Sequence, residues 1–205
     1  MKILAMELSS PRGSVAWREN APAPFGREFP NDRKHSGAFF EELRVITERF
    51  GKPDRIVVGL GPGSYAGTRI AIAAAIGLGA ATGAELLGVP SICGIPTSEN
   101  DYAVIGDARR HAFFFAHIRD RRCVAGPLLC TPPELKQRVE ETRGPVFASE
   151  LTPMVPEAVI AYPSAIVLTL IDPHSFSAGP LEPIYLREPH ITLPKSLPQL
   201  RAPTL

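Results

Sequence analysis

The sequence predicts an α/β protein with two related lobes, and two features support this prediction. The first is an apolar face at Phe39, Leu43, Ile46 and Phe50, whose spacing is that of a helix. The second is the apolar segment 55–60, which lacks alternation and therefore indicates a strand covered on both faces. Strands that alternate with helices in this way form a sheet with helices packed on it.

The first half is expected to form a mixed sheet with helices. We predict strands at 2–8 and 14–18, a helix at 35–50, a strand at 55–60, a helix at 68–82 and a strand at 85–89. Gly51 and Pro53 end the first helix, and Gly83 ends the second.

The second half echoes this order in abbreviated form. We predict strands at 102–107, 112–118 and 123–130, a helix at 132–141, a strand at 146–148, a helix near 164–170 and an extended segment at 184–187. These elements divide the chain into an N-terminal lobe at 1–98, a smaller C-terminal lobe at 99–188 and a proline-containing tail at 189–205.

Composition and charge exclude several classes of protein. The 205 residues include 22 basic and 21 acidic side chains, so the net charge of +1 does not suit a protein whose main task is to grip nucleic acid. The apolar run 3–6 is too short for a signal peptide, and the uncharged stretch 70–84 is too short to span a membrane. We therefore expect a cytoplasmic protein, without membrane contact, whose three cysteines are reduced.

A glycine-rich turn at 61–67 is the most informative segment. It loosely fits a dinucleotide-binding pattern, but the preceding strand is not the first of the chain and the usual acidic residue is missing. No Lys-Ser/Thr follows the glycines, so it is not a P-loop. We interpret it as a structural turn. Its candidate residues are Gly61, Pro62, Gly63, Ser64, Gly67 and Arg69.

The helix that follows the turn carries small residues at four-residue spacing, namely Ala71, Ala75, Gly79 and Gly83. Each interior glycine costs about 1 kcal/mol of helix stability, which close packing would have to offset. From spacing alone, the approaching partner is either the protein's own sheet or a second subunit. We predict a subunit interface, in which Gly79→Leu would block assembly without unfolding the chain.

Several motifs resemble those of the TsaB (YeaZ) family. They are the segment 58–70 around the glycine turn, the Ala/Gly helix, Leu87-Gly88-Val89-Pro90-Ser91, Asp107-Ala108-Arg109 and Pro183-Ile184-Tyr185-Leu186-Arg187. The resemblance is strong over residues 1–95 and weak after about 120, apart from the last motif. It implies the actin/Hsp70-like ASKHA (ribonuclease H-like) fold of two related lobes.

The resemblance also implies a function. Members of this family are non-catalytic partners of the TsaD-type transferase, which threonylcarbamoylates N6 of the adenosine at position 37 of tRNAs reading ANN codons. A TsaE-type ATPase joins the complex, the TsaB-type subunit forms a homodimer when alone, and tRNA is contacted only indirectly. The implied partner interface comprises His35 and Phe39 of the first helix together with the four small residues above.

The nucleotide site of the ASKHA fold is expected to be vestigial here. Its candidate residues are Glu7, Ser9, Ser10 and Asp107. Glu7 stands where the family has aspartate, and its longer side chain would displace a bound water or metal. We expect no tightly bound cofactor, only weak nucleotide binding at the interface of a complex. We also expect no metal, because no HxxxH or HExxH motif occurs.

Two alternatives remain open at this point. One is an active ASKHA enzyme, either an ATP-dependent transferase or a glycoprotease-like peptidase; a Ser64, His111 and Asp107 hydrolase arrangement belongs here but lacks a GxSxG motif. The other is a degenerate homologue that only self-associates. An arginine cluster at 109–110 and 119–122 is interpreted as a solvated surface rather than a phosphate contact.

Overall fold

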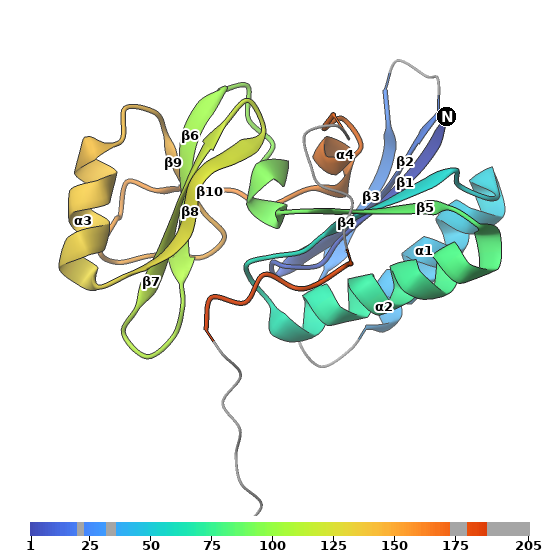
Figure 1. The fold of residues 1–205 in the computed structure, drawn as a ribbon, viewed down its shortest axis with the longest axis horizontal. Coiled ribbons are helices and arrows are strands. Elements are labelled where there is room, and N and C mark those ends of the chain that lie inside the picture. The colour runs from blue at the N-terminus through green and yellow to red at the C-terminus, as the bar shows by residue number, and fades with distance from the viewer. Residues whose placement is uncertain (20–22, 32–35, 173–179, 188–205) are drawn as a thin grey trace, which may run out of the picture.

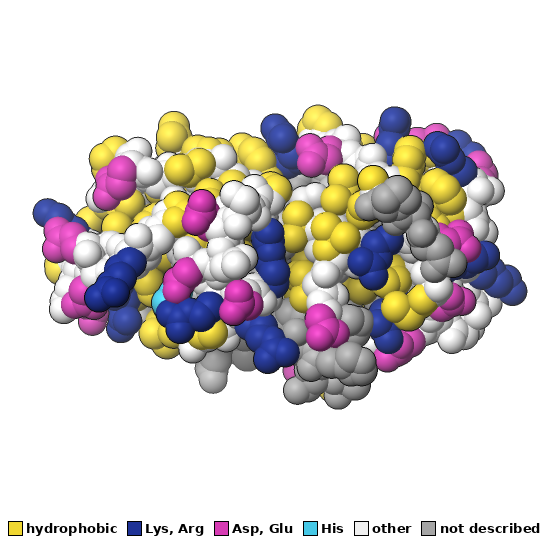
Figure 2. Space-filling view, turned by 90° about the horizontal axis from the view of Figure 1, so that it is seen from above, with side chains coloured by type: hydrophobic (Ala, Val, Ile, Leu, Met, Phe, Trp, Pro, Cys, Tyr) yellow, Lys and Arg dark blue, Asp and Glu magenta, His cyan; other side chains and the backbone are white. Residues whose placement is uncertain are grey.

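The computed structural model describes residues 1–19, 23–31, 36–172 and 180–187, and it consists of two α/β lobes (Figure 1). Each lobe contains a five-stranded sheet, in the order β3-β2-β1-β4-β5 and β10-β9-β6-β7-β8. Among the described residues, no helix is long and apolar enough to cross a membrane. Acidic and basic side chains are interspersed over the face shown in Figure 2.

The first sheet is mixed, as its sequence predicts. It contains β1 (Lys2–Glu7), β2 (Arg12–Glu19), β3 (Phe25–Pro30), β4 (Arg55–Gly59) and β5 (Glu85–Val89). The first three strands are antiparallel, and β4 and β5 run parallel to β1. Alternate residues of β1 and β4 enter two separate apolar clusters, so both faces of the sheet are covered.

Helices α1 (Gly37–Phe50) and α2 (Tyr65–Thr82) cover one face of this sheet (Figure 1). The predicted spacing holds in α1, which buries Phe39, Leu43 and Ile46. Gly83 ends α2 in a left-handed conformation, with φ +77°, and its N–H donates to the Gly79 carbonyl.

The second sheet repeats the strand order of the first. It contains β6 (Asp101–Asp107), β7 (Phe113–Arg119), β8 (Arg122–Cys130), β9 (Val146–Ala148) and β10 (Val159–Ile160). Strands β6, β7 and β8 are antiparallel; helix α3 (Pro132–Glu141) follows, and β9 returns parallel to β6. In the first lobe α2 joins β4 to β5, whereas the described segment between β9 and β10 contains no helix. The two lobes are therefore related, and the second is the shorter version.

The chain does not stay in the second lobe to residue 188, which corrects the predicted boundary. After β10, the short helix α4 (Ala165–Leu168) packs on β1, β2 and β4, across the first sheet from α1 and α2 (Figure 1). Further along, Ile184 N donates to Leu60 O at 2.8 Å. The first lobe therefore includes these returning segments, and the predicted tail at 189–205 lies outside the described residues.

Candidate functional site

The glycine turn is shaped by its close approach to the loop that follows β1. A Cβ on Gly63 would lie 2.1 Å from Ser9 O, and one on Gly67 would lie 2.1 Å from Leu8 O. Ser64 N donates to Ser9 O at 2.6 Å, and Ser64 Oγ caps α2 by accepting from Gly67 N at 3.3 Å. Glycine is required because no side chain fits between these two segments.

The other end of the turn is fixed to η1 (Ser91–Gly94), the 3₁₀ helix that leads into the second lobe. Gly61 N donates to Ser91 Oγ at 2.9 Å, and Ser91 N donates to Gly61 O at 2.8 Å. The turn thus ties the β1–β2 loop to the connection between the lobes, which agrees with its interpretation as a structural turn.

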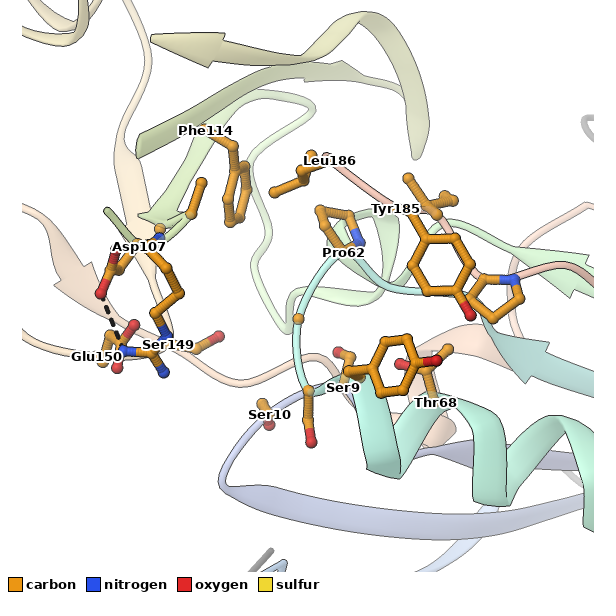
Figure 3. A pocket seen from close by; sticks show the side chains of 18 of the residues that line it. Ser9, Ser10, Pro62, Thr68, Asp107, Phe114, Ser149, Glu150, Tyr185 and Leu186 are labelled. Atoms are coloured by element: carbon orange, nitrogen blue, oxygen red, sulfur yellow. Dashed lines mark hydrogen bonds and ion pairs between the residues drawn. The ribbon is translucent and has the colours of Figure 1, made fainter. Parts of the chain in front are cut away.

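A cavity of about 660 Å³ opens between the two lobes beside this turn (Figure 3). The first lobe contributes Ser9, Ser10, Ser64 and Thr68, and the second contributes Asp107, Arg109, Ser149 and Glu150. The cavity is also lined by Pro183–Arg187 and by the rings of Tyr65 and Phe114. The cavity therefore offers hydroxyl groups on one wall, charged groups on the opposite wall and apolar surface between them.

The structure brings together three of the four residues predicted for a vestigial nucleotide site. Ser9, Ser10 and Asp107 face one cavity from its two walls (Figure 3). Asp107 accepts from the Arg109 backbone N–H at 2.6 Å and from its guanidinium at 3.0 Å. Glu7 is not among the residues that line the cavity, because it lies beneath the turn with no exposed surface.

Glu7 is held in a closed environment under Gly59. Its Oε1 accepts from Ser9 N at 2.6 Å, whereas its Oε2 has no hydrogen-bond partner among the described residues. A Cβ on residue 59 would overlap Oε2 at 1.7 Å, so Gly59 makes room for the carboxyl. Burial raises the pKa of Glu7, and the neighbouring Ser9 and Ser91 oppose this only in part. The residue is therefore placed to support the turn rather than to reach a ligand.

An exposed aromatic pair at the cavity mouth was not predicted from the sequence. Tyr65 at the start of α2 stacks on Tyr185, with ring centroids 5.4 Å apart. The Arg69 guanidinium lies 5.3 Å from the Tyr65 ring and donates to its hydroxyl at 2.9 Å. Hydrogen bonds with Tyr185 and Tyr65 raise the pKa of Arg69. The Pro-x-Tyr-Leu-Arg motif was the sequence signal, but a motif does not reveal which helix it meets.

The predicted partner interface must be corrected. Phe39, Ala71 and Ala75 are 0–1% exposed, Gly79 is buried against Leu86 of the protein's own sheet, and Gly83 is the αL cap. Ala71, Ala75 and Gly79 therefore let α2 approach its own sheet and are not accessible to a second subunit, whereas Gly83 at the end of the line is exposed. His35 lies outside the described residues.

The opposite face of α2 is exposed and uncharged from residue 70 to its end. It presents Ala73, Ile76, Gly77 and Ala80, and Ile76 is 50% exposed. A Cβ on Gly77 would meet nothing within 4 Å. Its helix cost of about 1 kcal/mol therefore has no compensating contact within the described chain.

The alternative hydrolase arrangement of Ser64, His111 and Asp107 does not form. Ser64 Oγ caps α2, Asp107 pairs with Arg109, and His111 lies in the turn that joins β6 to β7. His117 instead contacts Asp101, which also accepts from Arg119. Within the described ranges, no group of three or more His, Cys, Asp or Glu side chains could hold a metal ion.

Comparison with known proteins agrees with this geometry. Residues 38–129 match the model of the TsaD family, described as tRNA N6-adenosine threonylcarbamoyltransferase. An uncharacterized protein of Mycobacterium leprae is 34% identical over 140 residues, which cover 66% of this chain and 38% of that protein. An uncharacterized protein of Mycobacterium tuberculosis is 30% identical over 143 residues, which cover 66% of this chain and 65% of that protein. The chain thus spans about two thirds or less of these relatives.

Two solved structures share the fold over nearly the whole chain. One is an uncharacterized protein with similarity to peptidase YEAZ from Pseudomonas aeruginosa, with 19% identity, a TM-score of 0.75, and coverage of 91% of this chain and 99% of that one. The other is YeaZ from Pseudomonas aeruginosa, with 19% identity, a TM-score of 0.70, and coverage of 90% and 99%. The chain thus has the two-lobed fold of these two proteins.

Proposed function

We propose that this chain is a non-catalytic partner subunit that binds and activates a TsaD-type transferase in the threonylcarbamoylation of N6 of adenosine 37 in tRNAs reading ANN codons. The TsaD-family match over residues 38–129 and the YeaZ architecture support a role in tRNA modification. A TsaE-type ATPase and a homodimer formed in the absence of the transferase belong to the same proposal.

The exposed face of α2 is the observation that carries the proposal. The face is uncharged from residue 70 onward, and it contains a glycine whose helix cost is not offset by any contact among the described residues. Phe40 of the neighbouring helix α1 is also 50% exposed. A helical surface of the transferase that packs on this face would bury the apolar side chains and approach closely at Gly77.

The cavity takes a minor part in this proposal. Two arginines line it. Arg109 is already paired with Asp107, and Glu150 adds a negative charge on the same wall, while Arg187 lies on the returning segment. Phosphate groups would meet these carboxylates, so nucleotide would bind weakly and mainly where a partner adds positive charge.

Co-purification with the TsaD-type paralogue of the same organism tests the proposal. Ile76→Glu should abolish capture of the tagged chain's partner, because a carboxylate would be buried in the interface without a counter-charge. Leu151→Glu is the matched control, since Leu151 is 85% exposed on the second lobe. Both variants should keep the melting temperature of the parent protein.

A reconstituted modification assay separates this proposal from its alternatives. Mass spectrometry of digested tRNA should show threonylcarbamoyladenosine only when the chain and the transferase are both present. Product formed by the chain alone, or peptide hydrolysis by it, would establish the active enzyme instead. Dimerisation without any capture of the transferase would establish the self-associating homologue.

A further inference from the structure

Two of the three cysteines meet at the connection between the lobes. Cys93 lies in η1 and is fully buried, and Cys123 lies near the start of β8 and is partly exposed. Strand β8 packs against η1, and the backbone of Cys123 hydrogen-bonds to the Cys93 thiol. Both side chains belong to the apolar cluster between the two sheets.

Cys130 provides a contrast within the same strand. It is buried at the far end of β8, opposite Phe113, in the apolar cluster that includes Leu135 of α3. Its thiol lies on the other side of the second sheet from the cluster that holds Cys93. Of the three cysteines, Cys93 and Cys123 are therefore the two that share one apolar cluster. The Cys123 thiol donates to Ala125 O at 3.4 Å and to Gly126 O at 3.3 Å, so it must turn from these carbonyls to reach Cys93.

A disulfide between Cys93 and Cys123 would link two parts of the structure that now only pack together. Through η1, Ser91 is tied to the glycine turn, the Gly94 carbonyl accepts from Ser164 N at 2.9 Å, and the Ile92 carbonyl accepts from the Tyr102 hydroxyl at 3.3 Å. A bond from Cys93 to β8 would join this node covalently to the edge strand of the second lobe.

We propose that Cys93 and Cys123 form a disulfide under oxidising conditions and that this bond fixes the second lobe relative to the glycine turn. With oxidised glutathione as oxidant, the Cys123 thiolate attacks one glutathione sulfur and displaces the other as a thiolate. The Cys93 thiolate then attacks Cys123 Sγ and displaces the second glutathione. Two protein thiols are oxidised, one oxidised glutathione is reduced to two thiols, and the two protons from the protein thiols end on the glutathione.

Burial makes this oxidation slow at neutral pH. It raises the pKa of Cys123 and raises that of Cys93 to about 12, so the reactive thiolate is scarce. Below both pKa values the thiolate fraction increases tenfold for each pH unit, so the initial rate should rise roughly tenfold from pH 7 to pH 8. Cys93 and Cys123 are thus reduced under ordinary conditions, and the disulfide forms only when oxidising conditions persist.

Thiol counting on the full-length protein tests the proposal. After incubation with oxidised glutathione, acid quenching, unfolding and alkylation, the intact mass should show one alkylated cysteine instead of three. Peptide mapping should find Cys93 linked to Cys123, and the oxidised protein should melt at a higher temperature than the same sample after reduction.

The third cysteine supplies the matched control. After oxidation, the Cys130→Ser variant should have no alkylatable cysteine, because both remaining thiols form the disulfide. In Cys123→Ser or Cys123→Ala, Cys93 should remain alkylatable. Three alkylatable thiols in the wild-type protein after prolonged oxidation at pH 8 would overturn the proposal. So would a bridge that contains Cys130, or an oxidised protein that melts no higher than the reduced one.

Discussion

At the residue scale, Glu7 lies in an environment that its side-chain type disfavours. A carboxyl normally stays in water, yet this one is fully buried with one oxygen unpartnered among the described residues. Burial raises its pKa, so the folded state keeps the proton to a higher pH than the unfolded chain. Folding therefore binds a proton, and stability falls as the pH rises through that window.

Glu7→Gln should remove this pH dependence. The amide oxygen can still accept from Ser9 N, and no charge has to be buried at neutral pH. We expect the variant to be more stable than the wild type near pH 7, by about 1–3 kcal/mol, and the difference should shrink toward pH 4.5. Urea unfolding at several pH values measures it, with the exposed Glu150→Gln as control. A difference that grows as the pH falls would contradict the assignment.

Sequence reasoning could place Glu7 near the end of the first strand, among the residues of the expected nucleotide site, and the structure confirms its place in the strand. It could not show that the side chain points away from the cavity. That direction depends on Gly59 and Ser91, which lie more than fifty residues away and leave a space beneath the turn.

At the scale of elements, the glycine turn has the sharpest steric requirement. Gly67→Ala should destabilise the protein by about 1–3 kcal/mol, because the new methyl group would lie against the Leu8 carbonyl and push α2 from the β1–β2 loop. Thermal unfolding measures the effect. Gly37→Ala is the control, since a Cβ on Gly37 at the start of α1 meets nothing within 4 Å. Equal melting temperatures would show that the turn is not held closely.

The two interior glycines of α2 should respond in opposite directions. Gly77→Ala adds a methyl group in open space, so it should stabilise the isolated chain by about 1 kcal/mol. Gly79→Leu would overlap Leu86, whose Cδ2 lies 2.8 Å from the added Cβ, and should cost about 1–3 kcal/mol.

Chemical denaturation of the purified variants decides this pair of predictions. The result replaces the expectation from sequence that Gly79→Leu would separate assembly from folding. If Gly79→Leu unfolded at the same denaturant concentration as the wild type and Gly77→Ala at a lower one, α2 would have to be rotated relative to its sheet.

The small-residue line on α2 shows what a sequence pattern cannot predict. Ala71, Ala75 and Gly79 have the same spacing whether they meet a sheet or another helix, because the pattern records only that something comes close. The strand at 25–30 was missed for a different reason: it is an edge strand with a single buried side chain, and it lacks the alternation that predicts a strand. Element type was predictable where burial is strong, and the packing partner was not.

At the scale of the whole molecule, the two sheets share one topology although their sequences show only a loose echo. The predicted order of strands and helices was enough to indicate this, because antiparallel strands, a helix and a parallel return recur in both halves. The return of α4 to the first sheet was not predictable. Its four residues bury Ala165 and Leu168 against strands more than a hundred residues earlier in the chain.

The charge distribution of the whole chain governs how it meets tRNA. With 22 basic and 21 acidic side chains, and with both signs interspersed on the face in Figure 2, the chain can neutralise few phosphates at once. We therefore expect weak tRNA binding by the isolated protein and a shallow dependence of the binding constant on salt. Adding the transferase should steepen that dependence, because the partner then supplies the phosphate contacts. Filter-binding titrations between 50 mM and 200 mM salt measure both slopes, a range over which a protein making 6–10 phosphate contacts would lose about 10³–10⁵ in affinity. A loss of that size for the isolated chain would mean that it reads tRNA directly.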